Sequence, residues 1–273
     1  AEGVNTLASY LKSDVDLNIP VSKVKQEKTF AVIIANENYQ EEVNVEFALN
    51  DGMAFREYCI KLLGIPESNL HIRKDATLNN MLAEINWMQN IAKAYGAETR
   101  FIFYYAGHGM PDESNGTSYL LPVDGKSNIL ATGYSMSRLY AELNGLNAAC
   151  VTVLMDACFS GSKRGEGMLA SARGVALKAK AEAPKGNMLV MTAAQGSETA
   201  YPYKEKKHGL FTYFLLKKLQ ESKGKVTYGD LFDYVKTNVA QKSVVVNEKS
   251  QTPTIAVSGD LVSTWQGIRL NED

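Results

Sequence analysis

Residues 149–161, ACVTVLMDACFSG, contain the segment that decides the fold. The first half is a continuous apolar run, which is typical of a β-strand covered on both faces. The run ends at Asp156, and Cys158 stands two positions later among small and polar residues. The stretch therefore predicts a buried strand that delivers a carboxylate and a thiol to one end of a sheet.

Comparable apolar runs recur along the chain, and helical patterns lie between them. Further buried strands are expected at 30–36 and 187–194, a short strand at 69–75 and an edge strand at 252–259. The segment 100–109 is expected to be a buried strand that ends at Ala106 and runs into a glycine-bracketed turn. Apolar residues at helical spacing predict helices at 50–63, 77–96, 134–145, 209–220 and 227–240. Buried strands that alternate with helices form parallel sheets covered on both faces. We therefore predict an α/β fold with a mainly parallel central sheet of about six strands flanked by helices.

The chain divides into one domain and two flanking segments. Residues 1–28 are polar, and we expect them to form an N-terminal extension packed on, or draped over, the domain. The domain is expected at 29–262 and a C-terminal tail at 263–273. Within the domain, residues 158–186 are basic and rich in small side chains, which is typical of a loop that proteases can cut.

Composition excludes several classes of function. The 273 residues are 45% hydrophobic and 22% charged, as in an ordinary globular protein. The net charge of −1 gives no electrostatic case for nucleic acid as a partner. Apolar runs shorter than ten residues predict no membrane span. The chain begins AEGVN without methionine, so we expect either a secreted or periplasmic form after signal removal or a cytoplasmic protein.

The cysteines and histidines do not form a disulfide or metal pattern. Three cysteines are an odd count, and Cys59 and Cys150 fit the role of buried core thiols. The three histidines are scattered, and no Cys-x-x-Cys spacing occurs. We therefore expect no cofactor and no obligatory metal. An EF-hand loop is also absent from the sequence, so calcium activation has no recognisable site.

A histidine follows another predicted strand. The run RFIFYYAGHG (100–109) places His108 between two glycines. Function in open α/β sheets collects beyond the carboxyl ends of the strands, so His108 and Cys158 are expected to lie close together. A free thiol has a pKa of about 8.5, and a nearby imidazole raises its reactive thiolate fraction. His208 is also 50 residues from Cys158, but it precedes a predicted helix in a charged loop, where a surface or helix-start role is expected.

The pair FIFYYAGHG and VLMDACFSG resembles the caspase-like cysteine peptidases, peptidase family C14 of clan CD. It is most like the metacaspases and bacterial caspase homologues, whose cysteine motif is Asp-x-Cys-x-Ser-Gly. The resemblance extends from Phe30 to about Asp260, and His108 precedes Cys158 by the roughly 50 residues typical of caspases. It implies a caspase/haemoglobinase sandwich, Cys158 as nucleophile and His108 as base. The backbone N–H groups of Gly109 and Cys158 would form the oxyanion hole.

The resemblance also implies a substrate pocket. Asp51, in ALNDG, and Asp156 match the two aspartates of the first specificity pocket of metacaspases. Paired carboxylates in a partly desolvated pocket favour a guanidinium or ammonium group. We therefore expect an endopeptidase that cleaves peptide or protein substrates after exposed arginine or lysine. A carboxylate in the first turn of a helix also stabilises the macrodipole, which is an alternative role for Asp51.

Self-processing after the catalytic cysteine is a further hypothesis. The basic candidates in the linker are Lys163, Arg164, Arg173, Lys178, Lys180 and Lys185. Two other functions stay open: a non-catalytic caspase-like interaction scaffold, and a thiol-dependent non-peptidase hydrolase or acyltransferase. We expect a monomer.

Overall fold

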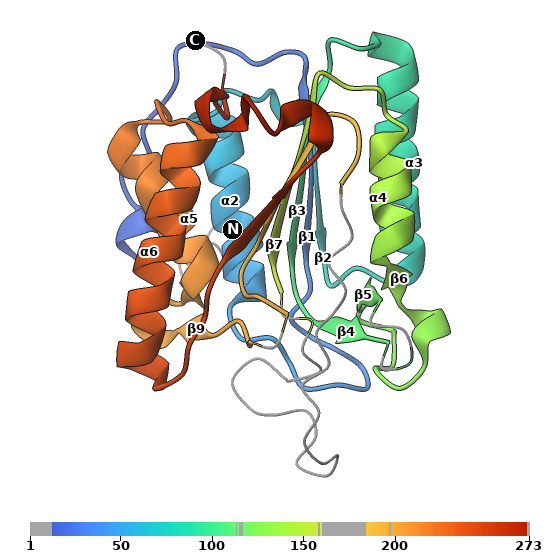
Figure 1. The fold of residues 1–273 in the computed structure, drawn as a ribbon, viewed down its shortest axis with the longest axis vertical. Helices are drawn as coiled ribbons and strands as arrows, with labels where there is room; N and C mark the ends of the chain where they lie inside the picture. Colours follow the sequence, from blue (N-terminus) through green and yellow to red (C-terminus); the bar gives the residue numbers. More distant parts are fainter. Residues whose placement is uncertain are drawn as a thin grey trace, which may run out of the picture.

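The computed structural model describes residues 13–112, 114, 117–157, 159, 184–196 and 198–271. Its centre is a six-stranded sheet in the order β11-β8-β7-β3-β1-β2 (Figure 1). The strands are β1 (Thr29–Ala35), β2 (Leu70–Lys74), β3 (Arg100–Ala106), β7 (Cys150–Asp156), β8 (Met188–Thr192) and β11 (Thr254–Val257). All neighbours pair in parallel except β11, which is an antiparallel edge strand. The predicted six-stranded, mainly parallel sheet is confirmed.

Five α-helices of the described chain cover the sheet in two layers. Figure 1 shows α2 (Ala48–Lys61), α5 (Leu210–Ser222) and α6 (Tyr228–Asn247) on one face, and α3 (Leu78–Tyr95) and α4 (Met136–Asn144) on the other. Each helix lies where helical spacing predicts one, and α6 continues beyond its expected end to Asn247. The domain is therefore an α/β sandwich of three layers.

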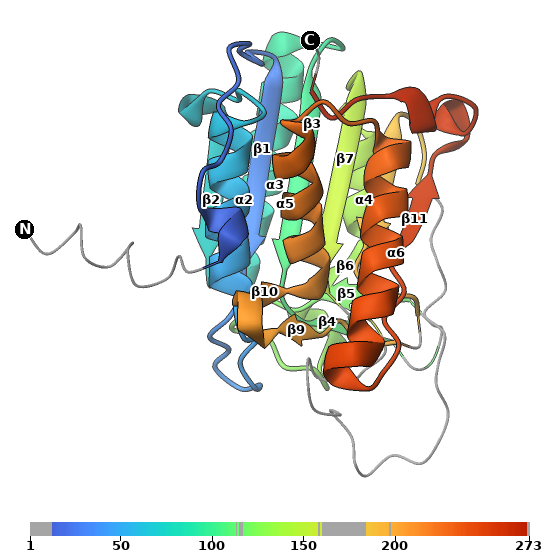
Figure 2. The same ribbon diagram turned by 90° about the vertical axis from the view of Figure 1, so that its left-hand side faces the viewer.

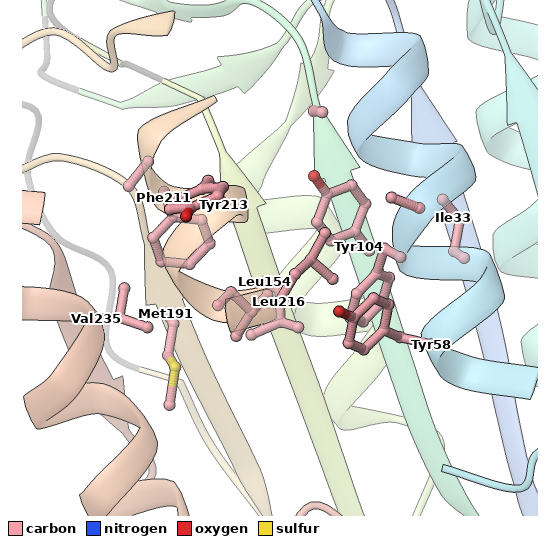
Figure 3. Packing of buried hydrophobic residues seen from close by; sticks show 14 of the residues in the cluster. Ile33, Tyr58, Tyr104, Leu154, Met191, Phe211, Tyr213, Leu216 and Val235 are labelled. Atoms are coloured by element: carbon pink, nitrogen blue, oxygen red, sulfur yellow. The ribbon is translucent and has the colours of Figure 1, made fainter. Parts of the chain in front are cut away.

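Side chains of each strand alternate between two cores, as the pleat requires. In β1, Ala31 and Ile33 face the core under α2, α5 and α6, whereas Val32 and Ile34 face the core under α3 and α4. Every residue of β1 and β7 is buried, which explains why both are continuously apolar in sequence. Figure 3 shows the first core, where rings and aliphatic side chains of the sheet and of α2, α5 and α6 interdigitate.

Cys59 and Cys150 belong to this packing and not to a disulfide. Both thiols are buried, and neither is bonded to another cysteine in the described part of the chain. Burial raises the pKa of the Cys59 thiol well above its ordinary value, because a thiolate would lose its hydration there. The predicted core role of both cysteines is confirmed.

One close approach fixes α2 against the sheet. A Cβ atom at Gly52 would lie 2.6 Å from the Cβ of Ala35, closer than packed carbon atoms allow. The glycine therefore lets the amino-terminal part of α2 lie directly on the carboxyl end of β1. That contact also sets the position of the neighbouring residue, Asp51.

Several short strands lie at the carboxyl edge of the sheet. β4 (Gly109–Pro111), β5 (Ser118–Leu120) and β6 (Tyr134–Ser135) form a small antiparallel sheet, and β9 (Pro202–Tyr203) pairs with β10 (His208–Gly209). Figure 2 shows them at the end to which β1, β3 and β7 point. The predicted end of the second strand at Ala106 is confirmed, and the short strand β4 begins three residues later, at Gly109.

The described part of the N-terminal extension packs on α2 and α5. A single 3-10 turn, η1 (Asp14–Asp16), buries the side chain of Val15 completely. The hydroxyl of Tyr58 in α2 donates to the carbonyl of Val15 at 2.7 Å. Lys217 of α5 pairs with Asp14 at 3.0 Å.

Candidate active site

The carboxyl edge of the sheet brings His108 and Asp156 to neighbouring strand ends. In the β3–β7 ladder, Ala106 is opposite Asp156, and His108 follows two residues after Ala106. Cys158 lies outside the described residues, as do the cleavage candidates Lys163, Arg164, Arg173, Lys178 and Lys180. The sixth cleavage candidate, Lys185, is described, and it lies three residues before Met188, where β8 begins.

The His108 ring is oriented by a backbone carbonyl. Its Nε2 lies 2.8 Å from the carbonyl oxygen of Val43, and the residue is 1% exposed. Because a carbonyl oxygen can only accept, Nε2 carries the hydrogen. In the neutral ring the basic nitrogen is therefore Nδ1.

Two tyrosines hold the backbone of His108. The N–H of His108 donates to the Tyr39 hydroxyl at 2.8 Å, and the Tyr105 hydroxyl donates to the His108 carbonyl at 2.7 Å. The Tyr39 ring also lies 4.6 Å from the imidazole, centre to centre. Burial raises the pKa of both hydroxyls, which keeps them protonated.

The glycine before His108 is required by this arrangement. A Cβ at Gly107 would lie 2.7 Å from the hydroxyls of both Tyr39 and Tyr105. Any larger residue would displace the two tyrosines that hold the histidine. The first glycine of the Gly-His-Gly pattern is therefore required because no side chain fits at position 107.

The loop that supplies the Val43 carbonyl is held at both ends. Near its start, the Asp75 carboxylate accepts the N–H groups of Glu37 and Asn38, each at 2.9 Å. The Glu37 carboxylate accepts the N–H of Leu49 at 2.9 Å and so caps the first turn of α2. These bonds fix the loop, which positions the Val43 carbonyl at His108.

Gly109 begins the strand β4 with its N–H turned away from β5. The Leu121 N–H donates to the His108 carbonyl at 2.9 Å, so His108 and Leu121 occupy a hydrogen-bonding position of the antiparallel ladder. Gly109 and Leu120 are the next pair in register. Because such positions alternate, the Gly109 N–H lies on the outer side of β4.

Asp156 lies beneath the amino end of α5. It is completely buried, and its Oδ2 accepts the N–H of Thr212 at 3.2 Å and the Thr212 hydroxyl at 2.7 Å. Thr212 is the third residue of α5, where the helix N–H groups have no partner within the helix. The carboxylate therefore caps α5 and benefits from its positive end.

Asp51 lies at the same helix end. It is completely buried and accepts the N–H of Gly209, the N-cap of α5, at 3.1 Å. It also accepts from Nδ1 of His208 at 2.8 Å. The two aspartates expected in the substrate pocket are thus both brought to the start of α5, and neither is exposed to solvent.

His208 is not at the surface, contrary to one of the two roles expected for it. It is completely buried in β10, directly before α5, so the helix-start role is confirmed. Its Nε2 lies 3.1 Å from Oδ1 of Asp16, opposite the contact with Asp51. Burial alone would lower the pKa of His208, but the hydrogen bonds and charges of Asp16 and Asp51 outweigh it and raise the pKa to about 9.

Comparison with known proteins identifies the family. The sequence model of the caspase domain, the peptidase C14 family, matches residues 28–260. The chain belongs to the caspase domain family. This assignment indicates a cysteine peptidase that acts on protein substrates. No curated protein matches the chain.

Solved structures share the fold of this caspase domain. The crystal structure of protein GSU0716 from Geobacter sulfurreducens has a TM-score of 0.61 at 18% sequence identity, covering 85% of this chain and 93% of that one. The crystal structure of caspase-1 from Spodoptera frugiperda has a TM-score of 0.60 at 14% identity, covering 89% of this chain and 92% of that one. At these identities the likeness concerns the fold, and the predicted caspase-like fold is confirmed.

The described part of the caspase domain offers no metal-binding cluster of three or more His, Cys, Asp or Glu side chains. Among the same residues no helix is both long and apolar enough to span a bilayer.

The sequence alone did not reveal three of the contacts at this edge: Val43 with His108, Tyr39 with His108, and Asp16 with His208. The first is made by a main-chain carbonyl, which any residue type carries. The other two join segments far apart in the chain. A histidine followed by glycine at a helix start was the sole visible signal for His208.

Proposed function

We propose that this caspase domain is a cysteine endopeptidase in which Cys158 attacks the substrate carbonyl and His108 moves the protons. The observation that carries the proposal is the contact between Nε2 of His108 and the Val43 carbonyl, because it assigns the base to Nδ1. His108 then takes the thiol proton and returns it to the leaving amine. Water hydrolyses the resulting thioester and regenerates the thiol.

The oxyanion that develops during attack needs preorganised donors. We assign this role to the backbone N–H groups of Gly109 and Cys158. The outward direction of the Gly109 N–H at the start of β4 supports the assignment. Since Gly109 follows His108 directly, the hydrogen bonds of Tyr39 and Tyr105 to the His108 backbone would position both the oxyanion donor and the base.

Cleavage after arginine or lysine, the preference of the metacaspase branch, is part of the proposal. Three carboxylates, Asp16, Asp51 and Asp156, gather near the start of α5, against one imidazole, His208. Even with that imidazole protonated, the group is net negative. A partly desolvated negative site favours a guanidinium or an ammonium over a carboxylate side chain.

Self-processing in the linker is the last part of the proposed function. Lys163, Arg164, Arg173, Lys178 and Lys180 follow the cysteine directly in sequence. Lys185 precedes the amino end of β8, which is the edge of the parallel sheet opposite His108. Cleavage within one molecule is therefore assigned to the first five positions, and Lys185 to cleavage by a second molecule.

The test compares wild type with Cys158→Ala and His108→Ala on fluorogenic peptides that present arginine, lysine or aspartate at the cleaved position. We expect turnover of the arginine and lysine peptides by wild type alone. Folded variants and wild type that are equally inactive would favour an interaction scaffold. Mass spectrometry of the products separates hydrolysis from acyl transfer, because transfer to an added amine leaves an amide in place of the free acid.

Self-processing is read from the same three proteins on a denaturing gel. Wild type should yield two fragments on incubation, whereas Cys158→Ala stays intact. Mixing the two then separates the modes: Cys158→Ala is cut at Lys185 by the wild-type molecules and not at the first five positions. An intact wild-type band at full peptidase activity would contradict self-processing.

A further inference from the structure

A buried chain of three ionisable groups runs inward from the N-terminal segment. Asp16 of η1 contacts Nε2 of His208 at 3.1 Å, and Nδ1 of His208 contacts Asp51 of α2 at 2.8 Å. His208 and Asp51 are completely buried, and the Asp16 side chain is 1% exposed. The three residues come from separate segments of the chain, so the fold itself assembles them.

The hydrogen-bond pattern fixes the charge of the middle member. Both partners of His208 are carboxylates, and an ionised carboxylate can only accept a hydrogen bond. Both ring nitrogens therefore donate, and the ring is an imidazolium. Two carboxylates buried without this cation would carry an uncompensated charge in a medium of low dielectric.

Other ionisable groups surround this chain without replacing His208 in it. They are Tyr58 of α2, Asp14 of η1, Lys206 of η4 (Lys204–Lys206), and Tyr213 and Lys217 of α5. Asp14 pairs with Lys206 at 2.9 Å and with Lys217 at 3.0 Å, so those two lysines are engaged by a different carboxylate. Among the described residues, it is His208 that contacts Asp51 directly.

We propose that His208 is a specificity-determining residue of this peptidase: its imidazolium holds Asp51 in place and offsets its charge, and so weakens the binding of a basic substrate side chain. The inference rests on the proposed function, since it concerns the same substrate site. It gives Asp51 a defined partner inside the protein, and it makes the affinity for arginine depend on the protonation of a histidine.

The N-terminal segment supports His208 in this role. Asp16 holds the proton on His208, and the segment is itself docked on the domain. The Tyr58 hydroxyl donates to the Val15 carbonyl at 2.7 Å, and the Gln220 amide donates to the Leu17 carbonyl at 2.7 Å. Residues 13–17 therefore act on the substrate site indirectly, through His208, although they belong to no strand of the sheet.

The first test removes the positive charge of His208 and keeps a hydrogen-bond donor for Asp51. His208→Gln retains an N–H donor for Asp51 but removes the cation. The KM for an arginine peptide should fall about 10- to 100-fold with kcat unchanged, as expected for one unit charge about 6–12 Å away at an effective dielectric of about 20. Asp51→Asn should raise the same KM by a comparable factor. His71→Gln is the matched control, because His71 pairs with Glu84 on β2 and α3, at the far edge of the sheet.

The second test uses pH and needs no catalysis. In a Cys158→Ala background, a fluorescent arginine peptide should bind more tightly as the pH rises through about 9, where His208 loses its proton. The His208→Gln protein should lack this change, and Asp16→Asn should move it to lower pH. Fluorescence anisotropy measures the affinities, and circular dichroism checks that each variant is folded.

The outcomes separate the two proposals. Absence of turnover by wild type would end the proposed function, while the binding arm would still decide the role of His208. Turnover by wild type together with equal KM values and equal pH profiles for His208→Gln would overturn the role of His208 and leave the peptidase intact. Failure of the peptide to bind at any pH would also overturn it.

Discussion

The buried His208 makes a quantitative prediction about stability. Its pKa rises from 6.5 in the unfolded chain to about 9 in the folded protein, because Asp16 and Asp51 outweigh the burial that opposes its charge. A raised pKa means that the folded state binds the proton more tightly. The resulting stabilisation is fully present below pH 6.5 and is lost as the pH rises through 9.

The size follows from the shift. Each pKa unit corresponds to about 1.4 kcal/mol, so a shift of this size contributes about 3 kcal/mol to the free energy of unfolding. The protein should therefore lose about 3 kcal/mol between pH 6 and pH 9.5 from this group. His208→Gln should be less stable than wild type at pH 6, and the two should converge at pH 9.5.

Urea denaturation followed by circular dichroism at several pH values measures this difference. His71→Gln is again the control, because it removes a histidine that pairs with a carboxylate elsewhere. The difference between wild type and His208→Gln cancels the titration of other groups. A difference that stays constant from pH 6 to pH 9.5 would refute the assignment of an imidazolium between Asp16 and Asp51.

Three further substitutions test how the site is held. Gly107→Ala puts a methyl group 2.7 Å from the hydroxyls of Tyr39 and Tyr105, which introduces strain on the order of 1–3 kcal/mol. The value of kcat/KM should therefore fall about 5- to 150-fold, and an unchanged kcat/KM would contradict the positioning of His108 by the two tyrosines. Tyr39→Phe removes the acceptor of the His108 N–H, so kcat should fall with KM unchanged in steady-state assays, and an effect on KM alone would oppose a positioning role. Thr212→Val removes the hydroxyl bound to Asp156, which should cost about 1–3 kcal/mol in urea denaturation; equal midpoints would exclude this cap as a source of stability.

The fold could be predicted from the sequence where burial dictates residue type. β7 and β1 are buried on both faces, so each appears as an unbroken apolar run, and long amphipathic patterns located α3 and α5. The short strands β4–β6 and β9–β10 escaped prediction, because two or three residues show no periodicity. They form where tertiary contacts, and not local preference, decide the backbone.

The candidate site could likewise be predicted only in part. His108 and Asp156 could be placed at the sheet edge, because each follows or ends a buried strand. The environment of Asp51 could not be predicted. The resemblance implies a pocket, but it does not indicate that His208 and Gly209 donate hydrogen bonds to the Asp51 carboxylate. The contact between His208 and Asp16 could not be predicted either, because two residues 192 positions apart produce no recognisable pattern in a single sequence.

Cleavage of peptide bonds after basic residues by Cys158 is the core of the proposed function. The most direct measurement is the digestion of a mixed peptide library, with every cleaved bond identified by mass spectrometry. Wild type should produce new carboxyl termini at arginine and lysine, and Cys158→Ala should produce none. Cleavage chiefly after aspartate, or the same cleavages with Cys158→Ala, would contradict it.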